Sequence, residues 1–263
     1  MQSHRAVLLL LLSVRLLRCG GMPLPWKLRA DPEESAGYAE GDMQLTERQR
    51  QELEHGPMGR NGLLDTTRRW PGNLVVYSIS TDFDAAHRQA ILKGMQTIEE
   101  TSCIRFREAN ELDVDYVSIT AQPGGCYTAV GYLGGQQQMN LEIYPIGEGC
   151  FRPGTVLHEL MHALGFYHEQ SSALRDDYIE VIAENIVPGK EFNFKKYSDK
   201  VVTDFDMGYD YNSCLHYRPG AFSINGKDTI VPLDPTAVIG QRLRLSDKDK
   251  DKINIMYKCP ILI

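Results

Sequence analysis

The chain has 263 residues, of which 42% are hydrophobic and 24% are charged, and its formal net charge is -7 at pH 7. This is the composition of an ordinary globular protein, so a chain that is disordered throughout is excluded. The acidic balance argues against a nucleic-acid partner, because proteins that bind nucleic acid present a basic surface. The length is enough for one good-sized domain and a small appendage.

Residues 1–21 have the pattern of a secretory signal peptide. Arg5 gives a short basic start, residues 6–12 form an unbroken apolar run, and small residues follow at positions 20 and 21. Arg15 interrupts the apolar stretch, so an unprocessed amphipathic N-terminus is the alternative. A membrane span would need about 20 apolar residues. We therefore expect a secreted, extracellular protein with no membrane partner.

Residues 22–60 are polar and irregular. Four prolines interrupt this stretch, and its charged run Leu45–Glu54 predicts one short helix. No pattern of a hydrophobic core is visible in it. The stretch is typical of a pro-segment or a linker, and it would precede a domain at 61–263.

From Trp70 onward the pattern is that of a packed domain. Three runs with β periodicity predict strands, at Leu74–Ile79, Asp115–Thr120 and Asn140–Tyr144. Three other runs predict helices, at Ala85–Cys103, Thr155–Gly165 and Ser246–Tyr257. Asp84 is a candidate N-cap, and Ser246 with Asp249 gives an S-x-x-D capping signature. This order predicts an α+β domain with a cleft between two halves.

The helix predicted at Thr155–Gly165 brings two histidines to one face. His158 and His162 are four residues apart, so both imidazoles can bind one metal ion. Gly165 can end the helix in a left-handed conformation, and the returning chain then brings His168 in as a third ligand. Glu159 lies one step round the helix, where its carboxylate can reach a metal-bound water. Three protein nitrogens with an open position describe a catalytic zinc site.

The whole pattern H-E-x-x-H-x-x-G-x-x-H is the metzincin motif, and its five fixed residues exclude a chance match. A structural metal site is the alternative, but such sites are usually closed by four protein ligands. The motif predicts a protease that hydrolyses peptide bonds through a zinc-activated water. Glu159 would act as the general base and then deliver the proton to the leaving amine.

The stretch His158–Gln170, in which Glu169 follows the third histidine, resembles the astacin family of metzincin proteases. Ser213–Tyr217 resembles the Met-turn of that family, and Thr101–Phe106 resembles its T-C-I-x-F segment. The resemblance covers residues 61–260 and implies a minimal, single-domain secreted member. It also implies a zincin-like fold: a mixed sheet and two long helices in the N-terminal half, and a mostly irregular C-terminal half with one terminal helix.

By this resemblance Tyr217 would bind zinc at rest and swing to support the oxyanion; an ordinary core aromatic is the alternative. Leu215 replaces the methionine of the Met-turn, and we expect activity to survive because the two side chains have similar volumes. Five cysteines follow Cys19, and four cysteines allow three pairings. The resemblance implies two disulfides and a buried free thiol, namely Cys103–Cys259, Cys126–Cys150 and Cys214.

Family members are kept latent by an aspartate in an F-x-G-D motif, which binds zinc in place of the catalytic water. Tyr38–Asp42 is offset by one residue but ends in Glu-Gly-Asp, so Asp42 is the candidate switch; a solvated acid is the alternative. Cleavage after Arg60 suits a trypsin-like activating protease. The resemblance then implies that the new N-terminal amine of Asn61 lies near Glu169.

Arg242 stands where the resemblance implies a cationic pocket for an acidic residue just after the scissile bond, with a surface arginine as the alternative. Together these residues predict a secreted zinc endopeptidase, made as a zymogen, with one Zn²⁺ per subunit. We expect a monomer that acts on proteins or peptides. The competing hypothesis is a catalytically weak or inactive secreted binding protein on the same fold. The complete histidine set and Glu159 favour the enzyme.

Overall fold

The computed structural model describes residues 31–55, 62–63, 65–197 and 202–260. The predicted signal peptide and the predicted cleavage site at Arg60 lie outside these residues. No helix within them is both long and apolar enough to cross a membrane.

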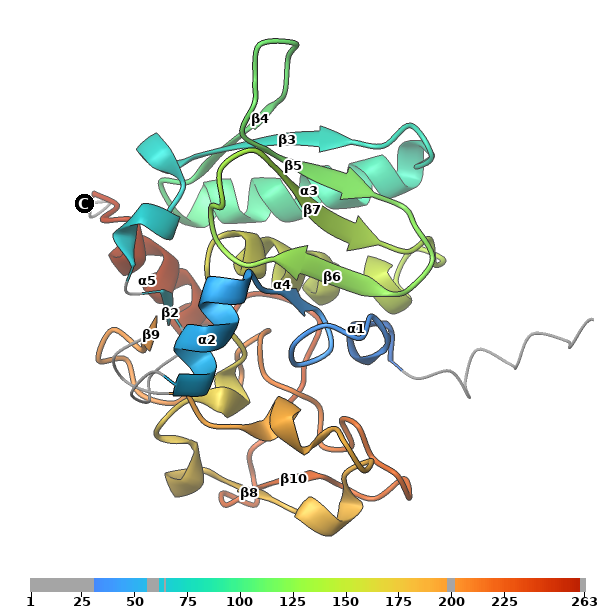
Figure 1. Cartoon of the computed structure of the whole chain (residues 1–263), viewed down its shortest axis with the longest axis vertical. Helices are drawn as coiled ribbons and strands as arrows, with labels where there is room; N and C mark the ends of the chain where they lie inside the picture. The colour runs from blue at the N-terminus through green and yellow to red at the C-terminus, as the bar shows by residue number, and fades with distance from the viewer. Residues whose placement is uncertain (1–30, 56–61, 64, 198–201, 261–263) are drawn as a thin grey trace, which may run out of the picture.

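A six-stranded mixed sheet forms the upper half of the molecule (Figure 1), with the strand order β1-β6-β7-β5-β3-β4. The strands are β1 Met43–Gln44, β3 Leu74–Ile79, β4 Arg105–Glu108, β5 Tyr116–Thr120, β6 Cys126–Ala129 and β7 Gln136–Leu141. Neighbouring strands are parallel except for the pair β6 and β7. The prediction of a mixed sheet is therefore confirmed.

The strand predicted at Leu74–Ile79 has the bounds of β3, and the next one begins a residue late. The strand predicted at Asn140–Tyr144 is wrong in its bounds, because β7 runs over Gln136–Leu141. The run of glutamines that begins β7 has little intrinsic preference for a strand. Pairing with β5 over five residues overrides that preference, and the pattern in the sequence does not contain this pairing.

Two long helices pack along one face of the sheet (Figure 1), α3 Ala85–Thr101 and α4 Pro153–Ala163. Asp84 caps α3 by accepting a hydrogen bond from the backbone N–H of His87 at 2.9 Å, as predicted. The two helices approach closely at Gly94, where an added Cβ would lie 2.7 Å from a methyl group of Val156. α4 begins two residues before the predicted helix, because Pro153 fits the first turn.

The C-terminal half has little regular structure. It contains a two-stranded sheet of β8 Ile179–Val181 and β10 Ile230–Pro232, the short pair β2 Gly62–Leu63 and β9 Val202–Thr203, and the terminal helix α5 Asp247–Met256. A second apolar cluster forms its core, and Tyr217 belongs to that cluster. The predicted capping box of α5 is present, because Ser246 and Asp249 exchange side-chain and backbone hydrogen bonds.

Two disulfides join distant parts of the domain, and they are the two that the resemblance implies. Cys103–Cys259 ties the chain after α5 to the end of α3, and Cys126–Cys150 ties β6 to the chain before α4. Cys214 is a buried free thiol.

The described part of the predicted pro-segment, residues 31–55, is here called the N-terminal segment. It contains α1 Pro32–Ser35, the strand β1 and α2 Glu47–His55, and it lies across the domain between the two halves (Figure 1). Met43 and Leu45 are only 1% and 6% exposed and belong to the main core. The N-terminal segment therefore contributes to the core, although its sequence shows no core pattern. Two apolar residues form no periodic pattern, and long-range packing alone buries them.

Candidate active site

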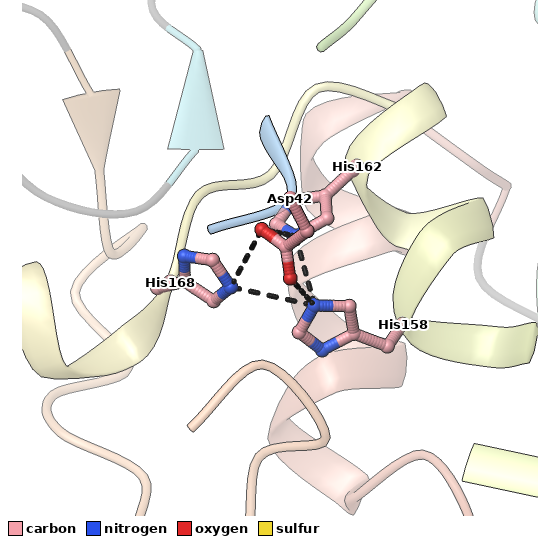
Figure 2. A group of neighbouring side chains, drawn as sticks. All are labelled: Asp42, His158, His162 and His168. Carbon is pink, nitrogen blue, oxygen red and sulfur yellow. Dashed lines mark hydrogen bonds and ion pairs between the residues drawn. The ribbon is translucent and has the colours of Figure 1, made fainter. Parts of the chain in front are cut away.

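Helix α4 carries His158, Glu159 and His162, and all three side chains are fully buried. The helix ends at Ala163, and Gly165 follows with a φ of 102°. A residue with a Cβ resists this left-handed conformation, so glycine allows the chain to reverse here. The reversal brings His168 to the same point as the two helical histidines (Figure 2).

The outer nitrogen of each imidazole is held by an acceptor. The Nδ1 atoms of His158 and His162 lie 2.8 Å and 2.7 Å from the carbonyl oxygens of Cys214 and Phe166. A carbonyl oxygen can only accept a hydrogen bond, so these Nδ1 atoms carry the protons. The Nε2 lone pairs therefore face inward, which is the arrangement that orients histidines as metal ligands.

The inner nitrogens converge. Nε2 of His158 lies 3.0 Å from Nε2 of His162 and 3.3 Å from Nε2 of His168. Two nitrogen ligands of a tetrahedral zinc ion, each at about 2.05 Å, lie about 3.3 Å apart. The carboxylate of Asp42 points into the same space (Figure 2), with Oδ2 3.0 Å from Nε2 of His158. The three nitrogens and this carboxylate could hold one metal ion, because their ligand atoms all lie within 4.8 Å of one another.

The charges of the site fit a cation. Burial acts to lower the pKa of His168, but Asp42 and Glu40 outweigh it and raise this pKa to about 9. The carboxylates thus favour a positive charge at this point, which a proton or a metal ion can supply. Oδ1 of Asp42 and Oε1 of Glu159 are buried without a hydrogen-bond partner among the described residues. Buried polar atoms without a hydrogen-bond partner are uncommon in proteins, and a bound metal ion with its water would account for these two oxygens.

The comparisons with known proteins agree with this geometry. The model of the peptidase family described as Astacin matches residues 63–258. The chain belongs to the astacin family. It is 43% identical to Seminal metalloprotease 1 of Drosophila melanogaster, over 89% of this chain and 92% of that protein. It is 39% identical to Zinc metalloproteinase nas-4 of Caenorhabditis elegans, over 89% of this chain and 73% of that protein.

Among solved structures the chain is similar to high choriolytic enzyme 1, a hatching enzyme zinc-protease from the medaka Oryzias latipes. The TM-score is 0.68 at 34% identity, and the match covers 74% of this chain and 97% of that chain. The predicted metzincin fold is thereby confirmed. This astacin-family chain is a zinc metalloendopeptidase whose substrates are proteins or peptides.

Asp42 reaches the three histidines from the N-terminal segment. Its carbonyl oxygen accepts a hydrogen bond from the backbone N–H of Thr128 at 2.9 Å, where β1 pairs with β6. Gly41 precedes it with a φ of 98°, and an added Cβ would lie 2.4 Å from the carbonyl oxygen of Glu33. Only glycine fits this turn, which accounts for the Glu-Gly-Asp sequence.

Glu40 makes three further contacts that the sequence reasoning missed. Its carboxylate lies 2.7 Å from Nδ1 of His168 and 2.6 Å from Oγ of Ser171. Its carbonyl oxygen accepts a hydrogen bond from the hydroxyl of Tyr217. Tyr217 is buried, and its ring centroid lies 4.8 Å from that of His168. The hydroxyl of Tyr217 therefore donates to a peptide carbonyl beside the histidines.

Glu159 lies on α4 next to His158 but outside the group of candidate ligands. Its Oε2 accepts a hydrogen bond from the hydroxyl of Thr128. Burial, with the charge of Asp42, raises the pKa of the Glu159 carboxyl well above its usual range. Burial also acts to raise the pKa of Asp42, but the three histidines outweigh it and hold that pKa below its usual range. The pKa values of the two neighbouring carboxyl groups are therefore shifted in opposite directions.

Arg242 is bound by an acidic residue of the N-terminal segment. Its Nε lies 2.8 Å and its Nη2 2.7 Å from Oε2 of Glu33. The same carboxylate accepts from the hydroxyl of Thr155 at 2.6 Å and from Arg152 at 3.1 Å. Arg152 also forms a bidentate pair with Asp31, at 2.9 Å and 3.0 Å.

A third arginine takes part in this contact. Nη2 of Arg218 lies 2.7 Å from Oε1 of Glu34, and the backbone N–H of Phe222 donates to Oε2 of Glu34 at 2.9 Å. Burial raises the pKa of the Glu34 carboxyl to about 7, although Arg218 acts to lower it. Neither Arg152 nor Arg218 was predicted. The closely spaced acids of the N-terminal segment were the available signal in the sequence.

Glu169 lies next to the third histidine and is 1% exposed. One of its carboxylate oxygens accepts from Lys252 at 2.8 Å, and the other accepts from the backbone N–H of Asp210 at 2.9 Å. The predicted contact with Asn61 falls outside the described residues.

Proposed function

We propose that this chain is the precursor of a secreted zinc endopeptidase, with a signal peptide at 1–21, a pro-segment at 22–60 and a catalytic domain at 61–263 that acts as a monomer. The observation that carries the proposal is the Asp42 carboxylate, which lies 3.0 Å from Nε2 of His158 among the three histidines. That is the position a catalytic water would need. The precursor is therefore latent until the pro-segment is removed.

His158, His162 and His168 are the proposed ligands. A bound zinc ion would supply water activation and carbonyl polarisation at this point. Oε1 of Glu159, which has no hydrogen-bond partner among the described residues, accepts the proton of that water and later delivers it to the leaving amine. Tyr217 donates to the carbonyl oxygen of Glu40 in the precursor. Once the pro-segment leaves, the same hydroxyl is free to donate to the oxyanion.

Removal of the metal tests the enzyme against the alternative of a secreted binding protein. We expect the protein lacking residues 1–60 to cleave casein or gelatin. A zinc chelator should lower this activity at least about 100-fold, because the metal and the general base act on the same water. Added Zn²⁺ should restore it, and the measurement is the initial rate of substrate cleavage. No cleavage by the zinc-loaded processed protein would favour the binding protein.

The activation site is tested by N-terminal sequencing. A trypsin-like protease should cleave after Arg60 and give an active form that begins at Asn61. The new amine can then approach Glu169, whose buried carboxylate already accepts from the ammonium of Lys252. An active form that begins far from Asn61 would contradict both the cleavage site and this anchor.

Substrate preference is tested at Arg242. In the precursor this arginine binds the carboxylate of Glu33, so it offers a cationic pocket once the pro-segment leaves. We expect peptides with Asp or Glu just after the scissile bond to have about tenfold higher kcat/KM than peptides with Ala, which corresponds to one charge-assisted contact. Arg242→Met should remove this preference, and the exposed Arg244→Met should keep it. Indifference of the parent enzyme to charge would refute the pocket.

A further inference from the structure

Helix α5 carries a fully buried lysine, Lys252, whose side chain is 1% exposed. An ammonium group is almost never fully buried unless it is paired, because removing it from water costs several kcal/mol. Nζ of Lys252 donates to Oε2 of Glu169 at 2.8 Å. Buried pairs of this kind can often be replaced by apolar residues without loss of stability. Stability alone therefore gives no reason for this pair.

Glu169 connects the lysine to the metal-facing histidines. It directly follows His168 in the chain, and its backbone N–H donates to the carbonyl oxygen of Leu215 at 3.2 Å. Its Oε1 accepts from the backbone N–H of Asp210 at 2.9 Å. Glu169 thus fixes the His168 segment to the turn 210–217, while Lys252 holds the other oxygen of the same carboxylate.

Asp249 lies three residues before Lys252, on the same face of α5. Its Oδ1 accepts from Oγ of Ser213 at 2.7 Å, and its Oδ2 accepts from the backbone N–H of Cys214 at 2.9 Å. The carbonyl oxygen of Cys214 is the acceptor that holds Nδ1 of His158 at 2.8 Å. Helix α5 therefore supports two of the three histidines. Lys252 contacts Glu169, which follows His168, and Asp249 contacts Cys214, whose carbonyl oxygen holds His158.

We infer that Lys252 is a positioning residue of the metal centre. Its ammonium holds the Glu169 carboxylate, and through it the imidazole of His168, in the orientation that binds zinc. The inference rests on the proposed binding of zinc by His158, His162 and His168. Removal of the partners that orient metal ligands typically lowers metal affinity 10–100-fold.

The test is the zinc affinity of the full-length protein, measured by competition with a chromophoric chelator. Lys252→Met keeps the length of the side chain and removes its charge, so it should weaken zinc binding about 10–100-fold. It should also change the visible spectrum of the Co²⁺-substituted protein, which reports the geometry of the ligands. The control is Lys250→Met on the same helix, whose ammonium pairs with the exposed Asp247, and its zinc affinity should stay within about twofold of the parent.

Lys252→Met leaves the charge of Glu169 buried without its ammonium partner, whereas the double variant Glu169→Gln/Lys252→Met removes both charges. A loss of zinc affinity in the double variant therefore reports lost positioning. The double variant also serves as the test if Lys252→Met alone does not fold. We expect its melting temperature to be close to that of the parent and its zinc affinity to be as low as that of Lys252→Met. Parental zinc affinity in either folded variant would overturn the inference. Failure of the parent chain itself to bind zinc would instead overturn the assignment of the histidines.

Discussion

Replacing Glu159 by glutamine should lower the kcat of the processed enzyme by roughly 10²–10⁴-fold, the range that general acid–base catalysis contributes. The amide keeps the shape of the side chain and its contact with Thr128, but it cannot accept the proton of the attacking water. Glu159 is not among the residues able to hold the metal, so zinc should remain bound. The measurement is kcat on a fluorogenic peptide together with the zinc content of the same sample.

The matched control is Glu180→Gln, which removes an exposed carboxylate from β8 and should leave kcat unchanged. A Glu159→Gln enzyme that keeps more than about a tenth of the parental kcat would exclude the general base, because a tenfold effect is below the usual contribution of such a group. Loss of zinc from that variant would show that Glu159 holds the metal site together instead.

Replacing Asp42 by alanine should make the uncleaved precursor active. Asp42 is the residue of the N-terminal segment that joins the three histidines, so its loss leaves a position for the catalytic water. Truncating one partner of a buried charge pair typically costs 2–5 kcal/mol, so activity should rise at least about tenfold. Glu33 still binds Arg242 and Glu40 still binds His168, so activity should stay below that of the processed enzyme.

This experiment needs precursors that cannot be processed, so every variant also carries Arg60→Gln. The measurement is the rate of casein cleavage, with the exposed Asp82→Ala as the control that should stay latent. If Asp42→Ala is as latent as the parent, Asp42 is not the switch. Latency would then rest on the contacts of Glu33, Glu34 and Glu40.

The sequence predicted the parts of the site that are local. The three histidines lie on one helix and the turn that follows it. The spacing that metal binding requires is therefore contained in eleven consecutive residues, His158 to His168. The caps of α3 and α5 were predicted for the same reason, because Asp84 and Ser246 act within three residues.

The parts that depend on long-range packing could not be predicted. Glu33 and Arg242 form their pair 209 residues apart in the chain, and neither residue type nor spacing indicates the other. Met43 and Leu45 are buried only because β1 joins the sheet. Lys252 stands in a helix of alternating charges, and the sequence does not distinguish it from the partly exposed Lys250.

The strand β1 also bears on the behaviour of the processed enzyme. It lies at the edge of the sheet, where Met43 and Gln44 pair with Thr128 and Ala129 of β6. If the pro-segment is removed as proposed, β6 should become an open edge with unpaired backbone groups. Open edges can add a strand from another chain, which is a route to self-association. Under the proposed processing, the precursor would be the form protected against aggregation, and cleavage would expose the enzyme to that hazard at the same moment that it exposes the active site.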